Sequence, residues 1–526
     1  MTTTPATVPR TLWGDLTRVV SDPRLRAVTL LSFASGLPLG LIWYAIPAWM
    51  TRAGIDIKVV GLFTLAQAPW SFKLLWSPTM DRYPLPWLGR KRGWMAAGQI
   101  GLLVLGLLLA GAARHPEAVW VIGALAFAIA FASATHDIAY DAYTVEVLER
   151  DELGIATGWR TALYRLAMLV SGGAAITLAA ETSWVVVNVA LALVYLPFLV
   201  LTARAPEPAN LPPPPRTLRE AVWGPFVGFL GQHRALEILG FVVLYKLGDN
   251  LTQALTRPFL IQLGFNDVDV GIGAGTIAAA AIVAGTFLGG WCTDRIGLGR
   301  ALWIFGFFQM FSNLGYALLA QVGPSRPVMC AAIAFELGSS GLGQGAFGVL
   351  LLRLTQKRFS ATQYALLSSL FTLPRILSGP VAGVLADAMG WRDFFILTVV
   401  FGVPGMAMLT RFVPWGVREV EFEVLAPRRG PALSRRALVT WATLGGAVTL
   451  AVGVGGRAAV GGLRALRAGH GFDCLPTLAG LASPASVGDW LTLAGLLVLA
   501  ALGALATAAT LVARRGLAAG DPPATA

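Results

Sequence analysis

The sequence predicts an all-α polytopic membrane protein with two pseudo-symmetric six-helix bundles and two extra C-terminal transmembrane helices. Three observations carry this prediction. The 526 residues are 56% apolar and only 13% charged, with a mean hydropathy of +0.67, whereas a soluble chain has about a quarter charged residues. Apolar runs of about twenty residues, long enough to cross a bilayer as a helix, recur along the chain. Short motifs in the first six runs return at nearly constant spacing in the next six.

Fourteen membrane spans fit the apolar runs. We expect them near residues 26–49, 57–80, 94–113, 118–146, 155–180, 184–203, 235–260, 268–291, 301–321, 327–352, 360–386, 391–412, 437–456 and 490–513. Four consecutive prolines, at 212–215, cannot continue a helix and mark a linker between two sets of six spans. We therefore expect, in order, an N-terminal bundle at 1–203, a cytoplasmic linker at 204–234, a C-terminal bundle at 235–412, a linker at 413–436, the extra helix pair at 437–513 and a cytoplasmic tail at 514–526.

The distribution of basic residues predicts the topology. The net charge is +12, but about two thirds of the 40 Lys and Arg residues fall in segments on the side of the two termini. Because cytoplasmic loops carry the excess of Lys and Arg, both termini are expected in the cytoplasm. The external loop 457–489, which contains three arginines, fits this assignment least well. The basic charge is thus a topology signal, and we expect no nucleic-acid partner.

The cysteines and the N-terminal segment exclude other classes. Cys292, Cys330 and Cys474 lie far apart, in a spacing that indicates neither a disulfide framework nor a metal site. We expect no cofactor. The polar and basic segment 1–26 does not have the pattern of a cleavable signal, and the apolar run after it is long enough to span the membrane.

An internal duplication relates the two sets of six spans. Residue pairs of the same type recur 210 or 213 positions apart, namely Gly54 and Gly264, Gly61 and Gly271, Asp81-Arg82 and Asp294-Arg295, Arg165 and Arg375, and Gly173 and Gly383. Two parallel repeats related by an axis along the membrane normal describe the major facilitator fold. The loops 81–92 and 294–300 resemble the signature of that superfamily between its second and third helices and its echo in the second half. We therefore expect Asp81, Arg82, Asp294 and Arg295 to form a cytoplasmic gating motif.

Charged residues stand inside two neighbouring apolar runs, at 131–175. His136, Asp137 and Asp141 precede a charged turn at 149–152, and Arg160 and Arg165 follow it. A central Asp or Arg costs about 2.5–3.5 kcal/mol to insert into a bilayer, so such residues usually face the interior of the bundle or a watery cavity. If the chain folds back at the turn, Asp137 and Arg165 reach the same depth, which predicts a buried ion pair.

The carboxylates of this region are candidates for proton coupling. Asp137 and Asp141 lie one helical turn apart on one face, and two carboxylates in a low-dielectric setting repel each other when both are charged, which suits a proton carrier. Glu336, in the tenth span, is the second candidate. The alternative is that Asp137 pairs statically with Arg165 while Asp141 only reaches cytoplasmic water. His136, which shares a stripe with Tyr140, is either a ligand contact or a hydrogen-bonded packing residue.

A polar stripe in the seventh span is the first candidate for substrate binding. Lys246, Asn250, Gln253 and Arg257 recur at helical spacing, with Asp249 beside them, and such a stripe is too polar to face lipid. The alternative is an internal contact, Lys246–Asp249 or Lys246–Asn250, that only stabilises the bundle. The other residues expected to contact the ligand are Arg165, Arg375, His136 and Tyr140.

Two further sets of residues remain open between two roles. Lys73 either faces the cavity or extends toward the cytoplasm. Trp43, Tyr44 and Trp49 either stack on a sugar or belong to the aromatic belt at the membrane interface.

These stretches together resemble the AmpG muropeptide permeases of the major facilitator superfamily. The matching text is FASGLP (33–38), FKLLWSPTMDR (72–82), SATHDIAYDAY (133–143), YRLAMLVSGG (164–173), LYKLGD (244–249), FSATQYALLSSL (359–370) and GPVAG (379–383). The resemblance implies proton-driven import of N-acetylglucosamine–1,6-anhydro-N-acetylmuramyl peptides across the bacterial inner membrane for peptidoglycan recycling. His136 and Tyr143 depart from the family, in which Gln and Trp are common at these positions.

The expected partners are a muropeptide, protons and the lipid bilayer, and the expected state is a monomer. Two other functions remain as alternatives. One is transport of another anionic solute, because eukaryotic acetyl-CoA transporters are similar in outline. The other is an intramembrane prenyltransferase, for which the spacing of Asp137 and Asp141 is suitable, although no second Asp-rich site accompanies it. A receptor or scaffold would require long soluble domains, which are not evident in the sequence.

Overall fold

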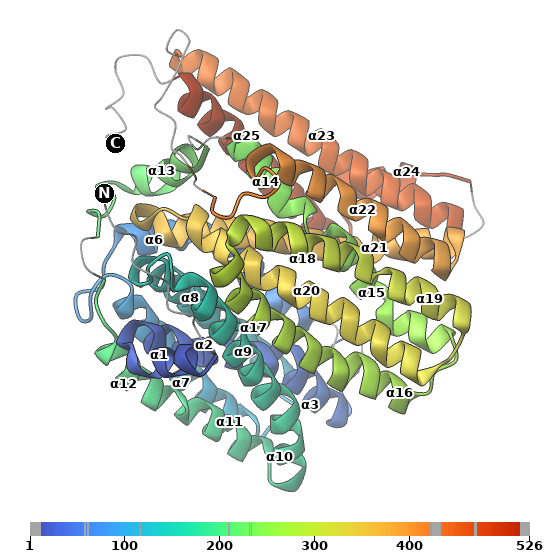
Figure 1. Cartoon of the computed structure of the whole chain (residues 1–526), viewed down its shortest axis with the longest axis horizontal. Helices are drawn as coiled ribbons and strands as arrows, with labels where there is room; N and C mark the ends of the chain where they lie inside the picture. Colours follow the sequence, from blue (N-terminus) through green and yellow to red (C-terminus); the bar gives the residue numbers. More distant parts are fainter. Residues whose placement is uncertain are drawn as a thin grey trace.

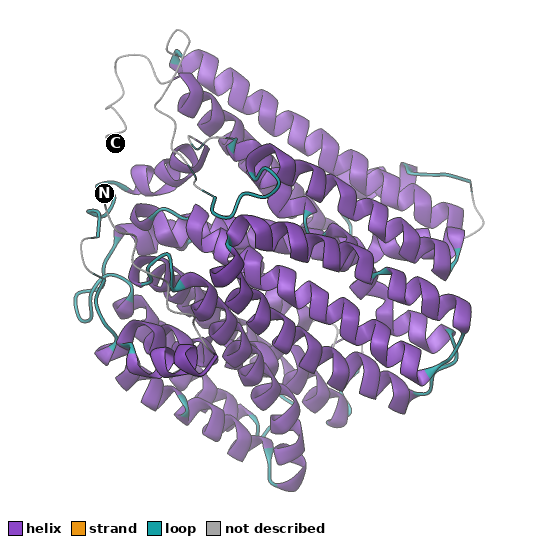
Figure 2. Ribbon diagram, in the orientation of Figure 1, coloured by secondary structure: helices purple, strands orange, loops and turns teal. Residues whose placement is uncertain are grey.

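The computed structural model consists of helices joined by short connections (Figures 1 and 2). It describes residues 12–56, 59, 63–115, 117–208, 211–230, 232, 234–420, 422, 433–467 and 471–515. Within these residues, ten helices are long and apolar enough to cross a membrane. Of the other four expected spans, two are the long helices α20 (Arg326–Leu354) and α21 (Ser360–Met389), and two are interrupted helices.

The first bundle follows a short helix, α1 (Leu12–Ser21). Its helices are α2 (Pro23–Gly40), η1 (Leu41–Ala45), α3 (Ile46–Arg52), η2 (Phe63–Gln67), α5 (Ala68–Phe72), η3 (Lys73–Leu75), α6 (Ser77–Arg82), α7 (Arg92–Ala112), α8 (Val119–Val147), α9 (Leu153–Leu169), η4 (Val170–Ala174), α10 (Ala175–Glu181), α11 (Trp184–Leu193) and α12 (Tyr195–Arg204). The second span is therefore a chain of short segments, from η2 to α6. The turn at 149–152 separates α8 from α9, as the sequence predicts.

The second bundle repeats this order. Its helices are α14 (Ala235–Leu244), α15 (Leu247–Gln262), α16 (Asp267–Gly271), η5 (Ile272–Ile277), α17 (Ala278–Ile296), α18 (Leu298–Ser312), α19 (Leu314–Val322), α20, η6 (Lys357–Phe359), α21 and α22 (Trp391–Phe412). The seventh span breaks between α14 and α15, at Tyr245 and Lys246. The two bundles lie side by side in Figure 1.

The predicted duplication is visible in the backbone. Gly54 ends α3 with φ 78°, and Gly264 ends α15 with φ 100°. The amide after each glycine donates to a carbonyl five residues earlier, from Ile55 to Met50 and from Phe265 to Leu260, both at 3.1 Å. This arrangement ends a helix with one left-handed residue, which glycine adopts without a steric penalty. The two spans therefore finish in the same way, 210 residues apart.

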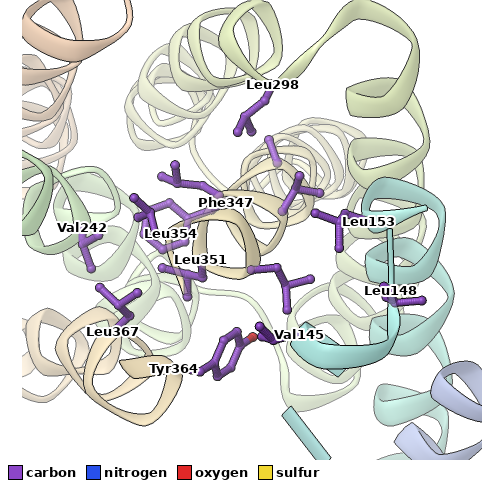
Figure 3. Packing of buried hydrophobic residues seen from close by; sticks show 14 of the residues in the cluster. Val145, Leu148, Leu153, Val242, Leu298, Phe347, Leu351, Leu354, Tyr364 and Leu367 are labelled. Atoms are coloured by element: carbon purple, nitrogen blue, oxygen red, sulfur yellow. The ribbon is translucent and has the colours of Figure 1, made fainter. Parts of the chain in front are cut away.

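The two bundles share an apolar core at one end only. We call this the linker end; there α6, α8 and α17 finish and α9 and α21 begin. Val145, Leu148 and Leu153 of the first bundle join Leu298, Phe347, Leu351 and Leu354 of the second in one buried cluster (Figure 3). Toward the opposite end, which we call the far end, each bundle has its own core, around Trp49 and Ile122 in the first and around Phe259 and Tyr316 in the second. The bundles are thus joined at the linker end.

The segment expected as a linker at 204–234 contains a helix, α13 (Leu218–Leu230). α13 packs against α6 of the first bundle and α21 of the second. The extra pair consists of α23 (Arg435–Arg467) and α25 (Val487–Arg515), with a short helix, α24 (Leu475–Ala482), between them. α23 and α25 lie along one edge of the molecule (Figure 1), and α25 contacts α13.

Candidate functional site

At the linker end, each bundle caps a helix of the other. Asp81, at the end of α6, accepts hydrogen bonds from the amides of Ala361 (3.1 Å) and Thr362 (2.9 Å), at the start of α21. Asp294, near the end of α17, accepts from the amides of Gly154 (2.9 Å) and Ile155 (2.7 Å), at the start of α9. A carboxylate at a helix N-terminus satisfies free N–H groups and the helix dipole. These contacts hold the two bundles together.

The arginines that follow the two aspartates take different positions. The guanidinium of Arg82 lies over the ring of Tyr83, and that of Arg295 lies over the ring of Trp291 at 3.5 Å. The aspartates of the expected motif thus link the bundles directly.

Glu146, at the end of α8, is a functional candidate that the sequence reasoning missed. Its carboxylate accepts a hydrogen bond from Ser360 of the second bundle (2.6 Å) and lies 3.9 Å from the ammonium of Lys91. The same ammonium is 2.6 Å from Asp81. These four side chains are buried, so the contact between the bundles contains a small charged network. Only its place near the end of an apolar run could have indicated Glu146.

The expected ion pair between Asp137 and Arg165 does not form within the described residues. Asp141 instead pairs with Arg160 and lies 3.7 Å from the ammonium of Lys73. The physical reason is the packing order: α9 lies against α2 and α17, and α8 packs against α7, α2 and α21. α2 and α9 are so close that a Cβ at Gly36 would meet the Tyr164 carbonyl oxygen at 2.2 Å. α9 therefore does not place Arg165 against α8.

Among the described residues, Asp137 has no ionic partner. Its side chain is buried, and its Oδ1 has no hydrogen-bond partner within the described structure. Lys73, Asp141 and Arg160 are close enough to act on it electrostatically. Asp137 and Asp141 thus share a helix face, but only Asp141 is held by cations.

His136 and Tyr140 lie inside the first bundle. The ring nitrogens of His136 are 3.2 Å from the Ser35 hydroxyl and 3.2 Å from the Gln99 amide. The Tyr140 hydroxyl donates to the Val28 carbonyl at 2.8 Å. Both side chains are buried against α2 and α7, so this geometry favours the packing role that the sequence left open for His136.

The polar stripe of the seventh span forms a network with α20. The Lys246 ammonium contacts Asp249 (3.0 Å) and donates to the carbonyl (2.6 Å) and hydroxyl (2.9 Å) of Ser340. Gln253 donates to Glu336 Oε1 (2.9 Å) and to the Ser340 hydroxyl (3.2 Å). Glu336 is fully buried, and its Oε2 has no partner among the described residues. The internal Lys246–Asp249 contact, left open from the sequence, is therefore present.

We expect Lys246→Ala to lower the free energy of unfolding by about 3–5 kcal/mol, because it leaves Asp249 charged and buried without its cation. Lys246→Ala with Asp249→Ala should lose less than the sum of the two single losses. Thermal unfolding of the purified full chain in detergent measures all three variants. Strictly additive losses would show that the pair contributes no coupling energy.

Arg165 in α9 and Arg375 in α21 occupy positions 210 residues apart in the two halves of the chain. The two guanidinium groups are close enough to repel each other, and neither forms an ion pair with a described residue. Arg165 is half-buried and Arg375 is exposed. The Arg375 guanidinium carbon is 6.0 Å from the centroid of the Trp43 ring, in the opposite bundle. Two neighbouring cations, neither paired with a described acid, form a place where an anion could bind.

The remaining candidates of the seventh span differ in exposure. Asn250 is half-buried, whereas Gln253 and Arg257 are exposed. Within the described residues, no group of three or more His, Cys, Asp or Glu side chains could hold a metal ion. Charged and amide groups thus lie within both bundles, and the bundles are joined at the linker end.

Comparisons with known proteins identify the family to which the chain belongs. Residues 28–379 match the family model of the Major Facilitator Superfamily. The chain is 42% identical over 394 residues to the "Anhydromuropeptide permease" of Escherichia coli (strain K12), a match that covers 74% of this chain and 80% of that protein.

Solved structures share the fold at low sequence identity. The proton:xylose symporter XylE aligns with a TM-score of 0.54 and 14% identity, covering 76% of this chain and 97% of its own. A bacterial homologue of the iron transporter ferroportin, in an outward-facing state, also has a TM-score of 0.54, with 15% identity and 73% and 98% coverage. The curated relative is named a permease, which supports the expectation of a transporter rather than an enzyme. The chain is a multi-pass membrane protein and belongs to the AmpG permease family of the major facilitator superfamily.

Proposed function

We propose that this chain is a proton-driven permease of the bacterial inner membrane that imports anhydro-muropeptides for peptidoglycan recycling. The observation that carries the proposal is the 42% identity over 80% of the length of the Escherichia coli anhydromuropeptide permease. In an anhydro-muropeptide, N-acetylated sugars are linked to an anionic peptide. Guanidinium groups that are unpaired among the described residues, together with amide side chains, are suited to such a molecule.

The linker end is the cytoplasmic end in this proposal. Most basic residues lie in the loops at that end, as the positive-inside rule requires of cytoplasmic loops. Both termini then lie in the cytoplasm, and the joined linker end corresponds to a transporter that faces the periplasm. Import follows when the bundles rock about the central site and the caps made by Asp81 and Asp294 open. The working unit is the monomer.

Arg165 and Arg375 hold the carboxylates of the ligand in this mechanism, while Asn250 and Gln253 hydrogen-bond its amide and hydroxyl groups. Lys246, Asp249 and Ser340 keep Gln253 and Glu336 in position. Asp137 accepts the proton first, because its Oδ1 lacks a hydrogen-bond partner and its carboxylate makes no ion pair among the described residues, and Glu336 is the second acid. Asp141 stabilises the bundle through Arg160 and Lys73.

We expect Arg165→Gln and Arg375→Gln each to weaken muropeptide affinity about 10- to 100-fold, since each removes a charge-assisted hydrogen bond worth about 1.5–3 kcal/mol. Arg114→Gln, at an exposed arginine in a loop at the far end, is the control and should change nothing. Binding is measured by calorimetry on the full chain in nanodiscs. Unchanged affinity in both variants would remove the two arginines from the site.

Uptake of labelled anhydro-disaccharide-tripeptide into proteoliposomes, with and without an inward proton gradient, tests the proposal as a whole. We expect accumulation that depends on the gradient. Unlabelled acetyl-CoA, added in excess, should not compete. If folded protein takes up no muropeptide but binds or transports acetyl-CoA, the substrate assignment is overturned and the family assignment stands.

A further inference from the structure

Trp43 and Trp70 form an aromatic pair whose indole N–H groups lack hydrogen-bond partners among the described residues. Trp43 lies in η1, a π-helical turn of the first span, and Trp70 lies in α5, a segment of the interrupted second span. Their rings are perpendicular (88°), with centroids 6.5 Å apart. The indole N–H of each is buried and has no hydrogen-bond partner in the described structure.

Two neighbouring buried donors without partners are energetically unfavourable, so their presence needs an explanation. Buried indole N–H groups usually find a partner, and an unsatisfied buried donor costs about 1–3 kcal/mol. Both donors lie where the regular helix is interrupted, and π-helical turns are frequent at functional sites. A ligand that brings two acceptors would recover this cost on binding.

The pair also lies at the boundary between the bundles. The Arg375 guanidinium from the second bundle lies over the Trp43 ring, and Arg165 lies within electrostatic range of Arg375. A molecule bound by these arginines is therefore beside Trp43. Trp49 differs, because it is buried and stacks on Trp184 of the same bundle at 5.2 Å. The three tryptophans thus separate into a pair at the boundary and a packing residue.

We propose that Trp43 and Trp70 form the carbohydrate subsite of the transporter. This proposal rests on the proposed function and assigns one part of the ligand to named residues. The C–H face of an N-acetylated sugar packs on an indole ring, and its acetamido and hydroxyl oxygens accept from the two free N–H groups. The peptide carboxylates extend toward Arg375 and Arg165. The paired rings suit an uncharged, partly apolar moiety, and the adjacent cations suit the charged one.

The test uses calorimetric binding to the full chain in nanodiscs. The probes are N-acetylglucosamine–1,6-anhydro-N-acetylmuramyl tripeptide, the same disaccharide without peptide, and the free tripeptide. Trp43→Phe and Trp70→Phe each keep an aromatic ring but remove one N–H donor. We expect each to weaken binding of both sugar-containing probes about 5- to 10-fold and to leave binding of the free tripeptide unchanged. Trp120→Phe, at a residue that is 75% exposed, is the matched control.

The outcomes separate the subsite from other roles. Equal losses for the sugar-containing probes and the free tripeptide would assign the pair to the peptide and overturn the proposal, and so would unchanged affinity in both variants. Melting temperatures of the ligand-free variants, compared with that of the control, show whether a loss of binding comes from unfolding. If the wild-type chain binds none of the probes, the proposed function fails, and the wild-type measurement alone reveals this.

Discussion

Asp81→Asn is expected to open the linker end of the transporter. The substitution removes the charge that faces Lys91 at 2.6 Å and weakens the cap on α21 made through Ala361 and Thr362. Removing one partner of a buried pair costs about 3–5 kcal/mol, and Lys91 then stays buried with Glu146, at 3.9 Å, as its remaining carboxylate. The chain can avoid this cost by separating the bundles and exposing Lys91 to water. A preference of this size changes the ratio of the two conformations by a factor of 100 or more.

The measurement is the spin-label distance across the linker end, with labels at two exposed residues, Arg204 on α12 and Arg300 on α18. We expect a distribution that moves to longer distances in Asp81→Asn and, by the equivalent cap on α9, in Asp294→Asn. Arg82→Gln is the control, since its guanidinium contacts the neighbouring Tyr83 ring. Distances that stay at their wild-type values in both aspartate variants would contradict a gating role for these residues.

Much of the fold could be predicted because the two halves repeat the same local sequence features at equivalent helix ends. Gly54 and Gly264 end their spans with the same left-handed turn, and the Asp-Arg pairs mark equivalent helix ends. These features depend on a few neighbouring residues. Helix α13 was missed because the prolines before it favoured a linker, although the apolar residues Phe226 and Phe229 of α13 are buried.

The contacts of the site were harder to predict, because they depend on which helices are neighbours. Spacing along the chain predicts the same depth for Asp137 and Arg165, but α9 packs against α2 and α17. The sequence contains no signal of that packing order. The Lys246–Asp249 contact could be predicted, since both residues lie on one helical turn. Glu146 and the Trp43–Trp70 pair depend on partners from other spans, and spacing along the chain does not reveal such partners.

Asp137→Asn is expected to abolish accumulation driven by the proton gradient while leaving the fold intact. The Asp137 carboxylate is buried, has an Oδ1 without a hydrogen-bond partner and makes no ion pair with a described residue. Asn has almost the same shape as Asp but cannot bind and release a proton in the same way. The substitution should therefore remove the coupling of uptake to the proton gradient and leave the fold unchanged. We expect gradient-driven uptake in proteoliposomes to fall at least 100-fold, whereas exchange of labelled for unlabelled muropeptide at equal pH persists.

Asp141→Asn is the matched control, because it makes the same change one helical turn away. Asp141 is held by Arg160 and lies near Lys73, so its loss leaves buried cations without their carboxylate and should lower the melting temperature. Two opposite patterns are therefore expected from one helix face: lost coupling with normal stability at Asp137, and lost stability at Asp141. If Asp137→Asn retains full gradient-driven accumulation, Asp137 is not the proton carrier. Glu336→Gln should then lose the accumulation, because Glu336 is another buried acid with an oxygen that has no hydrogen-bond partner among the described residues.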